Sequence, residues 1–307
     1  MNLRLMRLRR LAGSAAAGAV GAVATRLALR AVRPLLCRPV FERTNARGVR
    51  LPTAGGIAPM VVAPLLAGSV ALVAKRHSGV SHRSAATPAA VAVAAAGCGA
   101  LGLIDDLWGD VSGDVGTRGL GGHVGALRSG RVTTGAVKLI GAPAVGLITA
   151  ALIDRSCFRS GDGSLRPSAA STVVAAAVVA LGANVANLFD RAPGRCLKVV
   201  VLAGVPTVVA VGRRNPSAAA AGAAVVGAAL AMAPDDLGER VMLGDAGAGL
   251  VGGALAASAV AGASTRARVG ICAVLLALTV SSERWSFTTM IRSNAVLRMV
   301  DDLGRRT

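Results

Sequence analysis

Two adjacent carboxylates, Asp105 and Asp106, end an apolar run that begins near Pro88. A charged side chain near the centre of a bilayer costs about 3 kcal/mol on insertion scales, so acids at the end of a span lie in the interface or line a water-filled cavity. The pair is therefore a candidate site. The alternative is that both acids only end the span and solvate its last turn.

Three further stretches carry groups that suit phosphate, sugar or metal. Lys138 lies about two turns inside an apolar run, where an ammonium group needs a carboxylate or phosphate partner or must reach the interface. Asn184, Asn187 and Asp190 are spaced by three residues, which predicts one shared helical face and suits hydrogen bonds to a sugar or nucleotide. Asp245 lies in a glycine-rich turn, and its carboxylate suits a hard cation such as Mg²⁺ together with phosphate oxygens.

Other polar residues give weaker signals. Thr53 is followed by the glycine pair Gly55 and Gly56, whose backbone amides at a helix start could hold phosphate oxygens or simply form a turn. His123 could act as a base, although a single loop histidine is more often solvated. A solvated loop is also predicted for the acids Asp235, Asp236 and Glu239.

The composition predicts the scaffold. The chain has 307 residues, of which 53% are hydrophobic, and a mean hydropathy of +0.61, values that point to a multi-spanning membrane protein. Most apolar residues are small, which lets membrane helices approach closely. The net charge of +19 comes from arginines in short gaps between apolar runs, which favours loop anchors and lipid headgroup contacts over nucleic acid. The five cysteines show no CxxC spacing and predict neither disulfides nor a zinc site.

The apolar runs predict a single all-α integral membrane domain over residues 1–307, a polytopic bundle of about nine to ten transmembrane helices. An uncleaved first span is preferred to a signal peptide that would be cut near residues 22–24. The predicted spans are 11–32, 57–74, 88–104, 132–153, 168–188, 197–212, 216–233, 246–262 and 267–282. Loops after odd-numbered spans share one face, and all the polar stretches above lie in or beside these loops. The Lys and Arg content of the loops leans towards a cytoplasmic location for this face.

In their order along the chain, these stretches resemble the polyprenyl-phosphate N-acetylhexosamine-1-phosphate transferase family, which includes phospho-MurNAc-pentapeptide translocase. The resemblance runs from about Asn45 to Gly304. It rests on Pro-Thr-Ala-Gly-Gly at 52–56, the aspartate pair at 105–106, Gly-His at 122–123 through Lys138, Asn-Val-Ala-Asn-Leu-Phe-Asp at 184–190, and Gly-Asp at 244–245. Each motif alone is weak, whereas the ordered set is strong.

The resemblance implies transfer of a sugar 1-phosphate from a UDP-sugar to a polyprenyl phosphate in the plasma membrane, with release of UMP, as in the synthesis of peptidoglycan and other cell-wall glycans. Asp245, with Asp106, would bind Mg²⁺, and Asp105 would deprotonate or orient the lipid phosphate. Asn187 and Asp190 would position the nucleotide sugar, and Lys138 would neutralise phosphate charge. The implied substrate-binding set also includes Thr53, Gly55, Gly56 and Asn184, and a homodimer is left open.

The chain departs from the family at several points. Arg191 follows the third-stretch aspartate, where the family often has glycine, and Ala246 and Ala248 replace hydroxyl residues beside the metal aspartate. The family's histidine-rich loop is missing, because the chain has only His77, His82 and His123. Two alternatives therefore stay open: a family member with reduced turnover that binds lipid phosphate or a partner as a scaffold, and a transporter in which the intramembrane charges form the pathway.

Overall fold

A computed structural model describes residues 3–36, 38, 41–44, 48, 50–76, 83–109, 119–158 and 168–305. Residues 110–118 lie outside the described residues, as do Asn45, Arg47, His77 and His82. The elements are α1 (Leu3–Leu36), β1 (Glu42–Thr44), β2 (Arg50–Pro52), the 3-10 turn η2 (Ala54–Gly56), α2 (Ile57–Arg76), α3 (Arg83–Trp108), α4 (Gly119–Arg128), α5 (Thr134–Phe158), α6 (Ala169–Phe189), α7 (Arg195–Gly212), α8 (Pro216–Leu230), α9 (Ala233–Leu237), α10 (Gly244–Gly262), α11 (Thr265–Arg284), α12 (Phe287–Ser293) and α13 (Ala295–Asp302).

Eight stretches are long and apolar enough to cross a membrane, and together they make the chain a multi-pass α-helical membrane protein. They are α1, α3, α5, α6, α7, α8 with α9, α10 and α11. Each of the nine predicted spans coincides with a helix, but the apolar part of α2, Ile57–Leu72, is shorter than the other eight. Eight spans are thus supported by length and composition within the described residues.

Helix α10 occupies the centre of the bundle and packs against α3, α6, α7 and α8. Small residues make this packing close. A Cβ atom on Gly102 of α3 would lie 2.0 Å from the backbone oxygen of Asp245, and one on Gly252 would lie 2.2 Å from the backbone oxygen of Gly182 in α6. Because glycine adds no side chain at these crossings, the start of α10 reaches the acidic end of α3.

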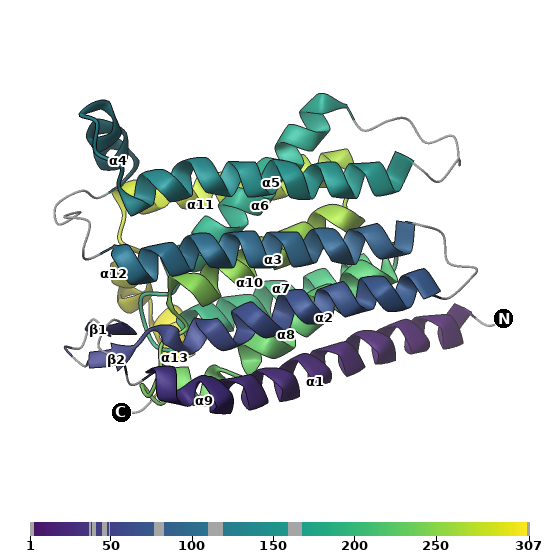
Figure 1. Ribbon diagram of the computed structural model, residues 1–307, viewed down its shortest axis with the longest axis horizontal. Coiled ribbons are helices and arrows are strands. Elements are labelled where there is room, and N and C mark those ends of the chain that lie inside the picture. Colours follow the sequence, from purple (N-terminus) through teal and green to yellow (C-terminus); the bar gives the residue numbers. More distant parts are fainter. Residues whose placement is uncertain are drawn as a thin grey trace.

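The polar elements gather at one end of the bundle (Figure 1). The β1–β2 pair, α4, α9, α12 and α13 lie there, and the described N-terminus of α1 lies at the other end. Strands β1 and β2 pair antiparallel, with Arg43 opposite Leu51. The end of α3 and the starts of α5 and α10 reach this same end, so the chemically active stretches of the sequence are brought to one face.

A buried ion pair joins three helices away from this polar end. Arg268 of α11 donates from Nη1 to Asp154 Oδ1 of α5 at 3.0 Å and to Ser171 Oγ of α6 at 3.3 Å. Thr172 donates to the second oxygen of Asp154 at 2.6 Å. Helix α11 otherwise presents an apolar outer face, so this cluster attaches it to the bundle.

Candidate functional site

Three charged side chains from three helices meet at the polar end. Lys138 Nζ of α5 donates to Asp105 Oδ2 of α3 at 2.6 Å and also to Asp245 Oδ2 of α10. The carboxyl groups of Asp105 and Asp245 contact each other, and the Thr134 side chain bonds to Asp105. The side chains of Asp105, Lys138 and Asp245 remain 26%, 23% and 33% exposed, so a ligand can reach them.

Asp106 has a different environment from its neighbour Asp105. It is buried, and its two oxygens accept hydrogen bonds from the backbone amides of Asp245, at 3.1 Å, and Ala246, at 2.9 Å. Carboxylates are favourable at a helix N-terminus because they meet both the free amides and the positive end of the helix dipole. Asp106 therefore holds the start of α10 in place, and this position brings Asp245 to Lys138.

Two more carboxylates complete the cap of α10. The backbone amide of Leu243 donates to Asp236 Oδ1 at 3.2 Å, and that of Gly244 donates to Asp190. Gly244 has φ of +70°, and a Cβ atom there would lie 2.8 Å from the backbone oxygen of Thr53. Four consecutive amides, 243–246, are thus bound by acids from α3, the turn after α6 and α9.

Asp236 was not predicted as part of a site, and the expectation of a solvated loop is wrong for it. Its exposed fraction is 4%, and its second oxygen accepts the Gly194 amide at 2.7 Å. Asp235 is also engaged, because it forms ion pairs with Arg26 and Arg240. The sequence held no local signal for this cap, because Asp236 lies seven residues before the Leu243 amide that it binds, too far to act as the N-cap residue of α10.

Asp190 lies just outside the apolar part of α6. Burial is the main reason that the pKa of its carboxyl group is raised well above the ordinary value. The negative charges of Asp236, Asp245 and Asp106 raise this pKa further, and the hydrogen bond from the Gly244 amide opposes the change. Asp190 therefore keeps its proton to higher pH than an exposed carboxyl group and can then donate a hydrogen bond.

The two asparagines of the third stretch are directed to different helices. Asn187 Oδ1 is buried beside α10, and within the described part of the chain no hydrogen-bond partner is found for it. Asn184 instead donates from Nδ2 to Thr279 Oγ1 of α11 at 3.1 Å. Three residues of an α-helix cover about 300°, which is about 60° less than a full turn. Asn184, Asn187 and Asp190 therefore point in successively different directions and do not share the one face that was predicted.

The predicted phosphate-binding turn packs against the segment before α10. Thr53 is buried and donates from Oγ1 to the backbone oxygen of Phe41 at 3.0 Å. A Cβ atom on Gly55 would lie 2.2 Å from Val241 Cγ1, and one on Gly56 would lie 2.3 Å from the backbone oxygen of Leu243. The glycine pair thus supplies close packing beneath the start of α10.

His123 lies in α4, and its side chain contacts the start of α5. Its Nδ1 is 3.0 Å from Thr133 Oγ1, and the ring covers the backbone at Gly135, where an added Cβ atom would lie 2.3 Å from the ring. The ring is partly buried, so it is not the freely solvated loop histidine of the sequence expectation. The ring packs near the first turn of α5, and Lys138 lies in the second turn of the same helix.

The carboxylates at this end of the bundle could hold a hard cation such as Mg²⁺. Mg²⁺ is usually bound through one or two carboxylates together with substrate phosphates. Asp105 and Asp245 have mutually contacting carboxyl groups that remain partly exposed, whereas both oxygens of Asp106 already accept backbone amides. The geometry therefore favours Asp105 over Asp106 as the companion of Asp245. Within the described ranges, no group of three or more His, Cys, Asp or Glu is arranged to hold a metal ion.

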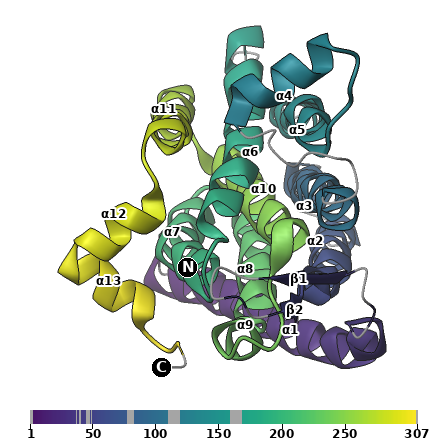
Figure 2. The same cartoon turned by 90° about the vertical axis from the view of Figure 1, so that its left-hand side faces the viewer.

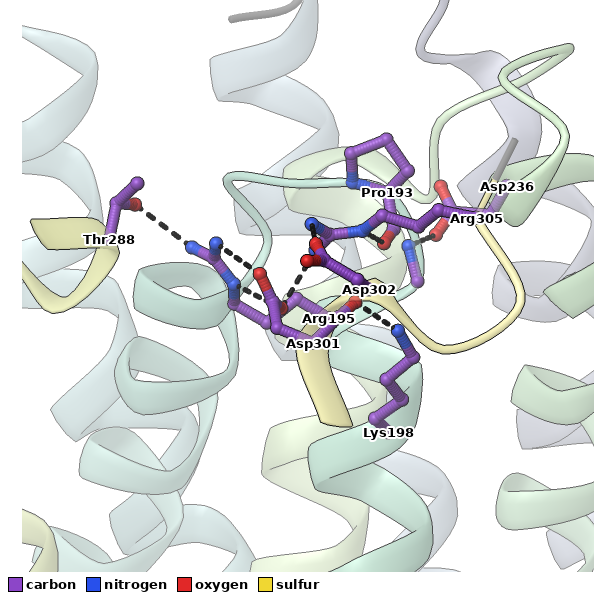
Figure 3. A network of polar contacts seen from close by, with 9 residues as sticks. Pro193, Arg195, Lys198, Asp236, Thr288, Asp301, Asp302 and Arg305 are labelled. Carbon is purple, nitrogen blue, oxygen red and sulfur yellow. Dashed lines mark hydrogen bonds and ion pairs between the residues drawn. The ribbon is translucent and has the colours of Figure 1, made fainter. Parts of the chain in front are cut away.

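A second polar network joins the C-terminal helices to the turn that carries Asp190 (Figure 3). Arg195, at the start of α7, makes a two-pronged ion pair with Asp301 of α13, with both distances 2.8 Å, and donates to Thr288 of α12 at 2.9 Å. Arg305 donates from Nε to the backbone oxygen of Pro193 at 2.8 Å. This network was not predicted, because the sequence beyond α11 offered no motif.

Asp301 is the only acid that Arg195 pairs with in the described residues, and this pairing changes the pKa of the Asp301 carboxyl group. Burial alone would raise the pKa of this carboxyl group, but the hydrogen bonds and positive charges of Arg195 and Arg305 lower the pKa below its ordinary value. The ring of Phe287 in α12 also stacks on Phe189 at 5.3 Å between centroids. The C-terminal helices are therefore fixed to the Asp190 turn by both charge and packing.

No model of a known protein family matches the chain, and no curated protein matches it either. The function is therefore inferred from the residues of the site and from the order of their motifs.

Proposed function

We propose that the protein is a phosphoglycosyl transferase of the polyprenyl-phosphate N-acetylhexosamine-1-phosphate transferase type. The observation that carries the proposal is the meeting of Asp105, Lys138 and Asp245, from three helices, at the polar end of a membrane bundle. Two carboxylates and an ammonium group at the edge of a span suit a reaction between two phosphates, one of which is anchored in lipid.

In the proposed reaction, an oxygen of polyprenyl phosphate attacks the phosphorus that carries the sugar in a UDP-sugar. The bond between that phosphorus and the bridging oxygen breaks, and UMP leaves with the bonding electron pair. The new phosphorus–oxygen bond gives a polyprenyl diphosphate sugar. Asp105 would orient the attacking phosphate, and any proton on that phosphate would pass to water.

The residues around the three charges take supporting roles. Lys138 would exchange a carboxylate contact for a phosphate oxygen and offset part of the charge of the two substrates. Asn187 has a buried amide oxygen that a sugar hydroxyl could satisfy, and Asp190 can donate a hydrogen bond while protonated. Asn184 is left out of this set because its amide already bonds to Thr279.

Asp105 and Asp245 are the residues that would hold Mg²⁺. The ion would neutralise charge on the transferring phosphoryl group. The protein's own part is to keep both carboxylates together at the end of α3 and the start of α10, which Asp106 does by binding two amides of α10.

The remaining proposals concern location. A UDP-sugar is made in the cytosol, so the polar end would face the cytoplasm from the plasma membrane, and the product would serve cell-envelope glycan synthesis such as that of peptidoglycan. A homodimer is compatible with the proposal but is not required by it, because the three central charges come from one chain.

The experiment measures UMP release by the full-length protein in detergent, with undecaprenyl phosphate and a panel of UDP-sugars, with and without Mg²⁺. Asp245→Asn should reduce release to background while leaving the protein folded, because a neutral amide cannot replace the charge. Asp302→Asn is the matched control; its side chain is 62% exposed, and its activity should stay near that of the unmodified protein. Near-normal activity of Asp245→Asn would remove this residue from the site.

The scaffold alternative has one supporting observation: Lys138 already neutralises part of the charge of both carboxylates. Polyprenyl phosphate binding without UMP release from any sugar of the panel would support that alternative.

A further inference from the structure

Helix α13 has the reverse of the usual burial pattern. Its one buried residue is the acid Asp301, whereas its large apolar side chains point outwards. Their exposed fractions range from 39% for Val300 to 71% for Leu303, the residue that follows the helix. We call these residues, together with Met290 of α12, the apolar stripe; it consists of Met290, Val296, Leu297, Met299, Val300 and Leu303.

The stripe is held outwards by the polar face of the same helix. Asp301 receives two hydrogen bonds from Arg195 and a further ion pair from Arg305 at 2.7 Å, and its backbone oxygen accepts from Lys198. Turning the helix to bury the stripe would break all of these charge-assisted contacts, which are the stronger class of hydrogen bond. The exposure of the stripe is therefore a fixed property of this fold.

The orientation of α12 and α13 differs from that of several membrane-spanning helices. In Figure 2, α2, α3, α5 and α11 are seen nearly end-on, whereas α12 and α13 are seen from the side at the edge of the bundle. The two helices follow α11, which is apolar enough to cross a membrane. Its side chains Val269, Val274 and Val280 are exposed on the outside of the bundle, as expected for a helix that faces lipid. The apolar stripe thus continues the apolar outer surface of the bundle at its polar end.

We propose that α12 and α13 lie in the plane of the membrane interface, with the apolar stripe among the acyl chains and Arg292 and Arg298 at anionic headgroups. Both arginines are exposed, and basic residues near a membrane surface attract anionic lipids. Burying apolar area in lipid removes the cost of leaving it in water. A second copy of the chain would be a poorer partner, because a symmetric contact would bring these arginines from both copies together.

This inference does not depend on catalysis. It places a lipid surface next to the turn that carries Asp190, because Phe287 stacks on Phe189 and Asp301 binds Arg195. A lipid-anchored ligand would therefore reach the polar end without leaving the membrane.

Lipid quenching of tryptophan fluorescence tests the inference on the full chain. The chain has two tryptophans, so Trp108→Phe and Trp285→Phe give a background without this signal. Met299→Trp then reports on the stripe, where the side chain is 67% exposed. Asp302→Trp is the control, because this side chain lies off the stripe and is 62% exposed. Both are reconstituted in phosphatidylcholine and phosphatidylglycerol vesicles, with or without bromine on the acyl chains.

Brominated lipid should quench Met299→Trp severalfold more than Asp302→Trp, and aqueous acrylamide should quench the two in the opposite order. Replacing phosphatidylglycerol by phosphatidylcholine should weaken the lipid quenching. Equal acrylamide quenching of both variants would overturn the proposal, because the stripe would then lie in water. Shielding of Met299→Trp from both quenchers would also overturn it, because protein would then cover the stripe. Neither result depends on UMP release, so the proposed function can fail separately.

Discussion

Replacing Lys138 with methionine leaves the carboxylates of Asp105 and Asp245 in contact without the ammonium group between them. Two like charges about 4 Å apart repel by about 4 kcal/mol at an effective dielectric constant of about 20. Removing one partner of a buried ion pair costs about 3–5 kcal/mol. All three side chains are 23–33% exposed, so solvent screening should reduce the loss of unfolding free energy to about 2 kcal/mol.

The assay is thermal unfolding of the purified protein in detergent, measured over a range of Mg²⁺ concentrations. The Lys138→Met variant should unfold several degrees lower without Mg²⁺. It should recover more stability on adding Mg²⁺ than the unmodified protein does, because the cation no longer competes with Lys138. Arg266→Met serves as the control, since Arg266 is exposed at the start of α11, and it should show neither effect.

An equal response of the unmodified protein and Lys138→Met to Mg²⁺ would refute this reasoning. A double variant gives a further check: adding Asp245→Asn to Lys138→Met removes one of the two like charges, and it should restore part of the lost stability in the absence of metal.

Gly102→Ala should lower unfolding stability by about 1–3 kcal/mol, because its Cβ would lie 2.0 Å from a backbone oxygen of α10, whereas Gly68→Ala, which meets nothing within 4 Å, should not; thermal unfolding compares them. Asp236→Asn should cost about 1–3 kcal/mol, because a neutral amide keeps one acceptor oxygen for the two backbone amides that the carboxylate binds; chemical denaturation measures the loss, and an unchanged midpoint would contradict it. The lowered pKa of Asp301 makes its contribution to stability complete above its unfolded pKa of about 3.9 and lost as the pH falls through the lowered value. The protection of the α13 amides against hydrogen exchange, taken relative to the intrinsic exchange rate at each pH, should therefore fall below about pH 4 and stay constant from about pH 5 to 7.

The helices could be predicted because their signal is local. Apolar runs bounded by charges, proline and glycine placed all nine predicted spans on helices, even the closely spaced pair that became α7 and α8. The expectation that the polar stretches share one face also agrees with their position in Figure 1. Length and hydropathy alone separate eight of these helices from α2, whose apolar part is shorter.

The different roles of the acidic residues could not be predicted, because each role depends on partners that are distant in the sequence. Asp105 and Asp106 are neighbours in sequence, but a residue step of about 100° turns one towards Lys138 and the other towards the amides of α10. Asp236 is buried only because the turn at Gly194 closes over it. The structure of α12 and α13 was missed for the same reason, since its polar anchor is the distant Arg195.

The cap of α10 has a consequence for the order of synthesis. Asp106 and the amide of Asp245 are 139 residues apart, so at about 5–20 residues per second the acid is made roughly 7–28 s before its partner. During that interval α3 must remain in the membrane without the two backbone amides of α10 that bind Asp106. Its position in the last turn of the helix makes this tolerable, because the acid can stay in contact with water. We expect the polar end of the bundle to stay open until α10 inserts. In a chain that stops before residue 244, these acids would lack the α10 amides that they bind.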